Sequence, residues 1–185
     1  GLMSFWRNMA NKILNKNRTE LAIMFAKLGF KRGAEIGVRR GDFSETLCTY
    51  IKTLEKFYAV DPWNIVYEDK QSRLFGVRRQ NRYYEIAKNI LSKYPFCEIV
   101  KKTSLEAVRD IPYESLDFVY IDGAHDFKSV ANDVCEWSKR VRVGGIVFGH
   151  DYKRRNNPAK HKYTVHVKDV VQAYCYAHRI DPWFV

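Results

Sequence analysis

Acidic and other polar side chains follow several short apolar runs of this chain, at positions where they could take part in chemistry. Ligands of doubly wound parallel sheets bind beyond the carboxyl ends of the strands, near the switch in strand order. If the apolar runs are strands, the residues that close them converge on one crevice. These residues are Glu35 with Gly37, Asp61, Thr103 with Ser104, Asp122, and His150 with Asp151.

The first cluster has the pattern Glu-x-Gly-x-x-x-Gly from Glu35 to Gly41. Glycines in a strand-to-helix turn let the backbone approach a ligand closely. The spacing differs from the Gly-x-Gly-x-x-Gly pattern that seats a pyrophosphate on a helix N-terminus, which disfavours a nicotinamide cofactor. An acidic residue at this turn favours a ligand with an ammonium group and no phosphate, such as S-adenosylmethionine. A purely structural role for Gly37 and Gly41 is an equal alternative.

Three further residues could complete an adenosine site. Asp61 could accept hydrogen bonds from both ribose hydroxyls, or it could be a turn or helix-cap residue. Trp63 could pack on the adenine face or be an ordinary core aromatic. Ser104 could hydrogen-bond the adenine edge or cap the helix that follows it.

The elements that must position these residues alternate between strand and helix. Apolar runs predict strands at 34–37, 57–61, 97–101, 117–122 and 146–148, and the start of another at 183–185. Helices are expected at 5–29, 43–53, 64–93, 105–108, 127–140 and 165–177. Gly29 is the expected C-cap of the first helix, Asp42 or Ser44 the N-cap of the second, and Gly144-Gly145 a turn. This alternation predicts an α/β fold: a doubly wound, mostly parallel, Rossmann-like sheet with helices on both faces, in three layers.

Length and composition bound the class of protein. The chain has 185 residues and no visible linker or repeat, so 1–185 is expected to form one domain that begins with a helical segment over 1–30. The four cysteines form no Cys-x-x-Cys pair, which favours free thiols and a cytoplasmic location. No apolar run reaches membrane-spanning length and no signal-peptide pattern is visible, so no membrane partner is expected.

The segment 64–93 and the formal net charge of +11 bear on the partner of this protein. Arginine and tyrosine in the segment suit a sugar, a carboxylate or a phosphate-bearing acceptor, and they also suit stacking on single-stranded RNA. We expect a lid or acceptor-specificity segment, with an amphipathic helix that has a solvated basic face as an equal alternative. The net charge favours a solvated cationic face over a nucleic-acid partner. The side chains concerned are Tyr67, Arg73, Arg78, Arg79, Arg82, Tyr83 and Tyr84.

Two later motifs resemble a known family. The chain reads Asp-Gly-Ala-His over 122–125, and later Gly-Gly over 144–145 and Gly-His-Asp-Tyr over 149–152. This pattern resembles the class I S-adenosylmethionine-dependent methyltransferases of the domain 24 type, the branch that includes macrocin-type and sugar O-methyltransferases. The resemblance spans about residues 33–177. It also takes in Glu35-Ile36-Gly37, Asp61-Pro62-Trp63, Phe127, Val130, Asp133 and Trp137.

The resemblance implies a reaction and the residues that perform it. It implies methyl transfer from S-adenosylmethionine to a small polar or sugar-like acceptor, at a hydroxyl group. Mg²⁺ or Mn²⁺ would be held by Asp122 and Asp151, with His150 beside them. His125 would be the general base, and His150 would be a second base or a softer ligand than the usual carboxylate. The cofactor would be bound by Glu35, Gly37, Gly41, Asp61, Trp63, Ser104 and Asp122.

Other interpretations stay open beside this one. An RNA methyltransferase agrees with the charge and the arginine-tyrosine segment, although no separate RNA-binding module is visible. A basic binding domain without catalysis is a third class. His125 could instead be a helix-start histidine bonded only to backbone. For Asp126 and Asp133, helix capping and structural pairing are favoured over a role in the reaction.

Overall fold

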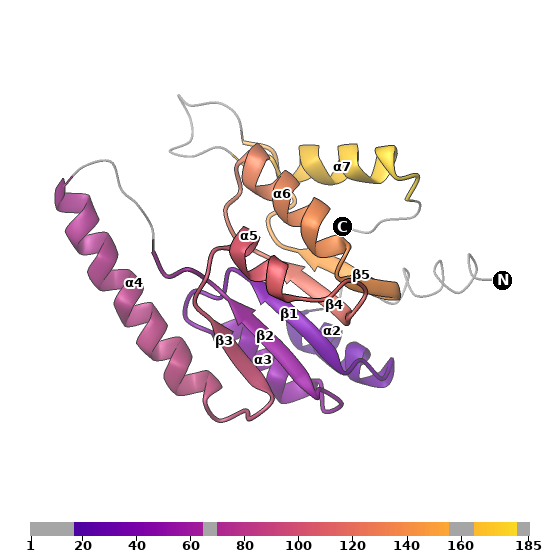
Figure 1. Cartoon of the computed structure of the whole chain (residues 1–185), viewed down its shortest axis with the longest axis horizontal. Helices are drawn as coiled ribbons and strands as arrows, with labels where there is room; N and C mark the ends of the chain where they lie inside the picture. Colours follow the sequence, from indigo (N-terminus) through magenta and orange to yellow (C-terminus); the bar gives the residue numbers. More distant parts are fainter. Residues whose placement is uncertain (1–16, 65–69, 156–164, 181–185) are drawn as a thin grey trace.

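The computed structural model describes residues 17–64, 70–155 and 165–180, with the side chains of 70–75 excepted. All described strands belong to one sheet, whose order is β3-β2-β1-β4-β5 and whose neighbouring pairs are parallel (Figure 1). The chain order therefore reverses between β1 and β4, which makes this pair the switch point. The strands are β1 (Arg32–Ile36), β2 (Lys56–Val60), β3 (Cys97–Val100), β4 (Leu116–Ile121) and β5 (Val141–Gly149).

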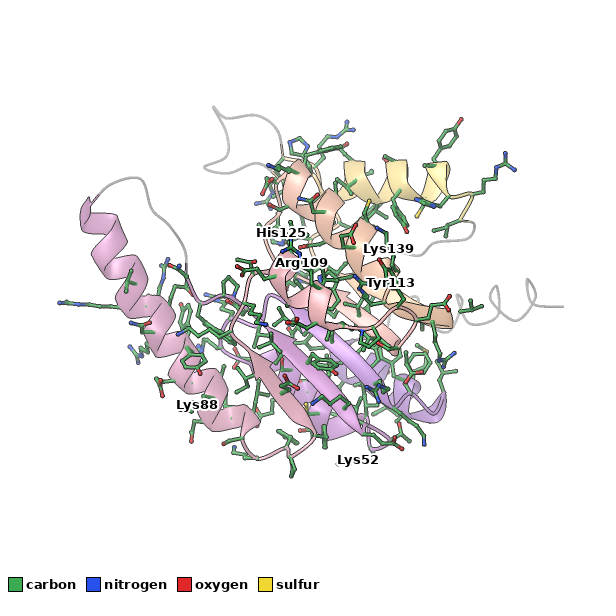
Figure 2. All side chains as sticks on the ribbon, in the orientation of Figure 1. Lys52, Lys88, Arg109, Tyr113, His125 and Lys139 are labelled. Carbon is green, nitrogen blue, oxygen red and sulfur yellow. The ribbon has the colours of Figure 1, made fainter. Side chains whose placement is uncertain are left out.

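Helices cover both faces of the sheet, so the predicted three-layer α/β fold is confirmed. On one face lie α2 (Arg18–Lys27), α3 (Asp42–Tyr50) and α4 (Lys70–Leu91). On the other lie α5 (Ser104–Ala107), a 3-10 turn (Val108–Asp110) and α6 (Phe127–Ser138). Helix α7 (Val167–Ala177) packs on the outside of α6 (Figure 1). Side chains fill the space between these layers (Figure 2).

Aromatic side chains dominate the core on the α2–α4 face. The ring of Phe118 on β4 lies 5.2 Å from that of Phe25 on α2 and 6.3 Å from that of Phe57 on β2. Gly33 on β1 makes room for it, since a Cβ there would fall 2.2 Å from the Phe118 ring. On the opposite face Trp137 of α6 is fully buried. Burial of such side chains is the main favourable term in folding.

Both ends of α2 are capped by its own sequence. Asn17 forms a capping box with Glu20, and Gly29 at φ 72° follows the last turn. The C-cap residue is Leu28, one position before the predicted Gly29. Gly29 follows it with a left-handed backbone, and backbone bonds from Gly29 and Phe30 to Ala26 and Phe25 close the helix end. The rest of the helix expected from Phe5, residues 5–16, lies outside the described residues, as does the strand expected at 183–185.

Helix α3 begins differently from the prediction. Its N-cap is Gly41, at φ 88°, where no side chain caps the helix. Neither Asp42 nor Ser44 serves as the cap, because Asp42 already lies inside the helix and the hydroxyl of Ser44 points to Glu35. The left-handed backbone at Gly41 makes a glycine the favoured cap at this turn.

The Gly144-Gly145 pair does not form a turn before β5 but lies inside that strand. Leu116 pairs with Val141 and Phe118 pairs with Ile146, so β5 bulges outward between these two pairs. Gly144 has φ 80°, and a Cβ on Gly145 would fall 2.4 Å from the Val141 side chain. Glycine is therefore needed for the bulge rather than for a reversal of the chain. No helix among the described residues is long and apolar enough to cross a bilayer.

Candidate active site

The carboxyl ends of β2, β1 and β4 bring three predicted site residues together. Ile36 pairs with Val60 on one side and with Ile121 on the other, so the next residues of the three strands are Gly37, Asp61 and Asp122. Gly37 has φ 95°, and a Cβ on it would fall 2.2 Å from the backbone oxygen of Asp122. This close approach of two turns explains the glycine structurally, and its contact with a cofactor stays a prediction. Gly41 likewise packs against α4, where a Cβ would fall 3.3 Å from Ala87.

Glu35, next to the last residue of β1, is enclosed by packed protein instead of facing the strand ends. Its side chain is buried, and the Ser44 hydroxyl of α3 donates a hydrogen bond to Oε2. The pKa of Glu35 is raised to about 8, mainly by burial and in addition by the charges of Asp122 and Asp61, against the opposing hydrogen bond from Ser44. The acid is therefore largely protonated at neutral pH. The charges of Asp122 and Asp61 thus act on Glu35, but the prediction that all three acids line one open crevice fails for Glu35, because its side chain is buried. The prediction that Glu35 itself contacts an ammonium group is corrected, because its carboxyl is closed off by packed protein.

Asp61 braces the loops that follow β1 and β2. Its Oδ2 accepts the backbone N–H of Arg39 at 2.9 Å, and its Oδ1 accepts that of Trp63 at 2.7 Å. Both residues have positive φ, 56° for Arg39 and 43° for Trp63, which costs free energy in non-glycine residues. Burial raises the pKa of Asp61, and these backbone bonds oppose the rise. Each carboxylate oxygen keeps another acceptor position, which a ribose hydroxyl could use.

Trp63 is a core residue, which corrects its assignment to the adenine face. Its side chain is only 3% exposed, so neither ring face is open to a ligand. The indole N–H donates to the backbone oxygen of Arg39 at 2.7 Å, and the ring meets that of Tyr84 edge-on at 5.0 Å. The tryptophan therefore stabilises the loop that Asp61 braces.

Ser104 does not cap the helix after β3, because Thr103 caps α5 through a capping box with Glu106. The Ser104 hydroxyl donates to Asp133 at 2.5 Å and accepts the Trp137 indole N–H at 2.8 Å. Burial raises the pKa of Asp133 to about 6. Asp133 therefore has the structural pairing that the sequence favoured, and an adenine contact by Ser104 stays a prediction.

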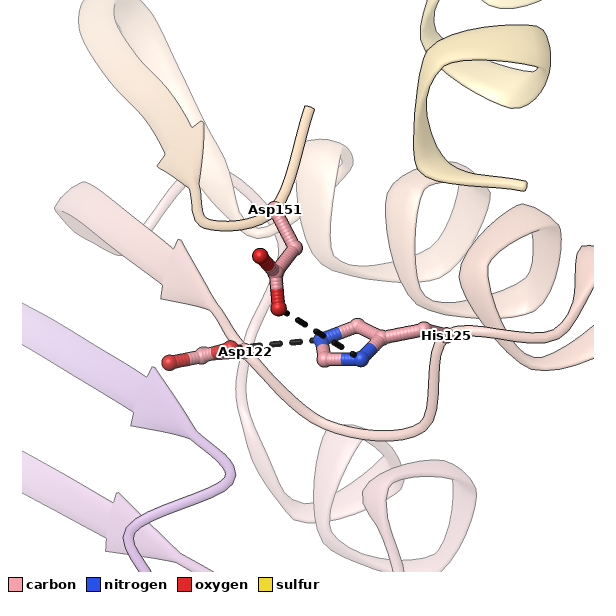
Figure 3. A group of neighbouring side chains, drawn as sticks. All are labelled: Asp122, His125 and Asp151. Carbon is pink, nitrogen blue, oxygen red and sulfur yellow. Dashed lines mark hydrogen bonds and ion pairs between the residues drawn. The ribbon is translucent and has the colours of Figure 1, made fainter. Parts of the chain in front are cut away.

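Two aspartates flank the imidazole of His125 beyond the ends of β4 and β5 (Figure 3). Its Nε2 lies 3.3 Å from Oδ1 of Asp122, and its Nδ1 lies 3.9 Å from Oδ2 of Asp151. The hydrogen bond with Asp122 raises the pKa of His125, and the charge of Asp151 acts in the same direction. Asp126 next to it caps α6 through the N–H of Ser129, as the sequence favoured. His125 is therefore held by side chains and is more than a helix-start residue.

His150 and Lys153 complete this cluster. Nδ1 of His150 lies 3.5 Å from Oδ2 of Asp151 and 3.8 Å from Oδ1 of Asp122. Lys153 donates to Oδ1 of Asp151 at 2.9 Å and holds the pKa of that carboxyl below its usual range. Asp151 has φ 52°, so the backbone after β5 is strained where it turns this side chain toward β4.

One atom each from Asp122, His125 and Asp151 lie within 4.8 Å of one another, a spacing that could hold a cation. The sequence predicted the two aspartates with His150 beside them, and it missed His125 as a third ligand candidate. The Asp-Gly-Ala-His motif could have indicated this contact, because three residues after Asp122 are enough for the chain to turn back and place His125 beside it.

The second carboxylate oxygen of Asp122 contacts Tyr120 instead of the histidine cluster. Oδ2 accepts the hydroxyl of Tyr120 at 3.4 Å, and that hydroxyl accepts an N–H of Arg18 at 3.4 Å. Neither Tyr120 nor Arg18 was predicted as a site residue. They lie 102 positions apart in the chain, so only the fold brings them together.

The arginine-tyrosine segment forms most of α4, described over Lys70–Leu91; Asn64 is not helical, and residues 65–69 lie outside the described part of the chain. The Arg39 guanidinium lies 5.3 Å from the Tyr83 ring and the Lys101 ammonium 4.2 Å from the Tyr84 ring. Arg78 and Arg82 are exposed. Tyr67 and the side chain of Arg73 lie outside the described residues, and the role of this segment as a lid stays a prediction.

Comparison with known proteins places this site in a family. The sequence profile of a family described as a methyltransferase domain matches residues 34–152. An uncharacterized protein, y4gI of Sinorhizobium fredii (strain NBRC 101917 / NGR234), is 26% identical over 100 residues, which make up 54% of this chain and 10% of that protein. The chain thus spans about a tenth of the length of this curated relative.

Solved structures share the fold at low sequence identity. An O-methyltransferase from Bacillus cereus in complex with S-adenosylhomocysteine has a TM-score of 0.61 at 15% identity, over 96% of this chain and 77% of that chain. An rRNA methylase from Streptococcus thermophilus has a TM-score of 0.56 at 13% identity, over 88% and 81%. The family profile covers more than half of the sequence, from β1 to the residues after β5. The chain therefore belongs to this methyltransferase family.

Proposed function

We propose that this protein transfers a methyl group from S-adenosylmethionine to a hydroxyl of a small polar or sugar-like acceptor, with a divalent cation at the acceptor end of the crevice. One observation carries the proposal. Asp122 follows β4 at the switch point, level with Gly37 and Asp61 after the neighbouring strands, and also contacts His125 in the cluster with Asp151. The family membership and the likeness to the O-methyltransferase structure support the same conclusion.

The crevice suits the charges of an adenosyl sulfonium. The carboxylates of Asp61 and Asp122 favour a cationic ligand, and their charges add to the burial that raises the pKa of Glu35. Asp61 offers its remaining acceptor positions to the ribose. When bound, S-adenosylmethionine supplies an electrophilic methyl group on its sulfonium. The carboxylates would hold the cofactor with that methyl directed toward the cluster around His125.

The cluster suits a transition-metal cation better than magnesium. Two carboxylates and one imidazole form a mixed donor set, whereas magnesium prefers oxygen ligands alone. We therefore favour Mn²⁺ over Mg²⁺, with Asp122, His125 and Asp151 as the residues that would hold it. A bound divalent cation would lower the pKa of an acceptor hydroxyl.

An imidazole of the cluster takes the proton that the hydroxyl releases. When no cation occupies these residues, Asp122 and Asp151 raise the pKa of His125, which makes it a stronger base than an isolated histidine. The His150 side chain is 46% exposed and touches the same carboxylates, so it is the second base when His125 is engaged by a cation. In the complete step the acceptor oxygen would take the methyl as its bond to sulfur breaks, and the imidazole would take the hydroxyl proton, so that a neutral thioether is left.

Calorimetry with S-adenosylhomocysteine and with MnCl₂ tests the proposal. The wild-type protein should bind both, Asp151→Asn should lose only the metal, and Asp122→Asn should weaken both. Glu114→Gln is the matched control, because Glu114 is exposed just before β4, at the opposite end of that strand. Absence of heat and of thermal stabilisation with the nucleoside would remove the enzyme proposal.

A second candidate is methylation of RNA. The exposed Arg78 and Arg82 of α4, the net charge of +11 and the likeness to an rRNA methylase favour it. Binding of RNA through phosphates falls steeply with salt. A salt-sensitive gel shift at micromolar protein that Arg78→Gln/Arg82→Gln removes would support RNA over a small acceptor.

A further inference from the structure

Arg18, the first residue of α2, is seated on a rigid aromatic platform. Its guanidinium lies 4.8 Å from the centre of the Phe43 ring, and its Nη2 donates to the Tyr120 hydroxyl at 3.4 Å. Phe43 and Tyr120 are buried and meet edge-on at 4.5 Å. The arginine itself is exposed. Its charged head is therefore positioned by packed side chains while remaining open to a ligand.

The guanidinium has unused binding capacity. It carries five N–H donors in a planar fork, and one of them is used by Tyr120. Among residues 17–64, 70–155 and 165–180, no carboxylate lies within ion-pair distance of it. Its positive charge acts on Glu35, where it opposes the rise in pKa that burial causes. A ligand carboxylate would fit such a fork in bidentate fashion.

The carboxylate of Asp122 contacts the same Tyr120 hydroxyl as the Arg18 guanidinium. The Tyr120 hydroxyl accepts from Arg18 and donates to Oδ2 of Asp122, each at 3.4 Å. A guanidinium and a carboxylate thus flank a single hydroxyl at the switch point. An α-amino acid carries its ammonium and its carboxylate on one carbon. The Arg18 guanidinium and the Asp122 carboxylate, which contact the same hydroxyl, therefore complement both ends of such a zwitterion.

We propose that Arg18 binds the carboxylate of the methionine moiety of S-adenosylmethionine, while Asp122 receives the ammonium group on the same carbon. This inference rests on the proposed function, because it needs an adenosyl cofactor in the crevice. It places a binding residue on α2, before the stretch that the family profile matches. It also separates the two oxygens of Asp122: Oδ2 serves the cofactor and Oδ1 serves the histidine cluster.

Three ligands that differ in one group at a time test this assignment by calorimetry. They are S-adenosylmethionine, decarboxylated S-adenosylmethionine, which keeps the sulfonium and the amine, and 5′-methylthioadenosine, which lacks the whole amino-acid part. The variants are Arg18→Gln and Arg18→Lys. Arg109→Gln is the control, since Arg109 is exposed on the 3-10 turn across the sheet (Figure 2).

The wild-type protein should bind S-adenosylmethionine about tenfold or more tightly than the decarboxylated ligand, the usual scale for a hydrogen-bonded charge pair. Arg18→Gln should remove that preference and leave binding of the other two ligands unchanged. Arg18→Lys should retain part of the preference, because it keeps the charge without the fork. Arg109→Gln should behave as the wild type.

Two results would overturn the assignment of Arg18 alone. One is equal wild-type affinity for the carboxylated and decarboxylated ligands. The other is an equal loss of affinity for all three ligands in Arg18→Gln, which would point to a structural role for the arginine. Failure of the wild-type protein to bind any of the three, 5′-methylthioadenosine included, would instead overturn the proposed function.

Discussion

Nε2 of His125 lies 3.3 Å from Oδ1 of Asp122, so the acidic residue that directly follows β4 orients the imidazole three positions further along the chain. The opposite oxygen of the same carboxylate accepts from Tyr120. The two oxygens of Asp122 therefore serve the contact with Tyr120 and the contact with His125 separately, and the first of these lies on the proposed cofactor side. Substitutions on either side should then separate cofactor binding from the chemical step.

Replacement of His125 by alanine should leave the affinity for S-adenosylhomocysteine intact and slow methyl transfer about a hundredfold or more, the usual contribution of a general base. Single-turnover kinetics with radiolabelled cofactor and an identified acceptor provide the measurement. His178→Ala is the control, because His178 is exposed at the end of α7. Equal rates in the wild type and His125→Ala would reduce His125 to a structural residue.

Replacement of Asp61 by alanine should weaken S-adenosylhomocysteine binding by about 1–3 kcal/mol, because hydrogen bonds to a charged group are lost. The melting temperature should also fall, since the N–H groups of Arg39 and Trp63 lose their acceptor. Calorimetry and thermal melts measure the two effects separately. A lower melting temperature with unchanged affinity would show that Asp61 only braces the loops.

Replacement of Glu35 by glutamine should change how stability depends on pH. The pKa of Glu35 is raised from 4.5 to about 8, so the folded protein keeps a proton that the unfolded chain releases. Its contribution is fully present below about pH 4.5 and is lost as the pH rises through about 8. Above that pH, Glu35→Gln should be more stable than the wild type by about 1 kcal/mol or more. Urea unfolding from pH 5 to 9 measures this, and parallel pH profiles of the two proteins would contradict it.

Two glycines with positive φ allow a matched comparison of backbone strain and steric clash. Gly29→Ala introduces a Cβ with nothing within 4 Å, so it should cost about 1 kcal/mol of unfolding free energy. Gly37→Ala places the Cβ 2.2 Å from the Asp122 backbone oxygen, so it should cost about 3 kcal/mol or more. Chemical denaturation measures both. Similar costs at the two sites would show that the turns after β1 and β4 can move apart.

The strand ends were predictable because local patterns determine them. Short apolar runs closed by Gly37, Asp61 and Asp122 predicted a parallel sheet, and parallel strands necessarily bring such residues to one edge. The caps were less predictable. A polar residue near a helix start favours capping by its side chain, but at α3 the left-handed backbone of Gly41 takes that place.

The predictions for Trp63, for a helix cap at Ser104 and for Glu35 failed because the environments of these residues are made by contacts between distant parts of the chain. Nothing near Trp63 in the sequence indicates that Tyr84 and the Arg39 carbonyl enclose its ring. The partners of the Ser104 hydroxyl lie 29 and 33 residues further along, at Asp133 and Trp137. The pattern at 35–41 favoured an open acid, and only the packing of α3 against the sheet closes Glu35 off.

The bulge in β5 has a consequence for the position of His150. Between the two pairs, β4 advances by two residues, from Leu116 to Phe118, and β5 by five, from Val141 to Ile146. The surplus of β5 over β4 is therefore three residues, an odd number. Side chains on a strand alternate between its two sides, so the removal of a single glycine from the bulge makes the surplus even. The chain must then slip along β4, or the last residues of β5 must face the opposite layer of helices. The parity of one irregular segment thus decides how the chain leaves the fifth strand on its way to His150.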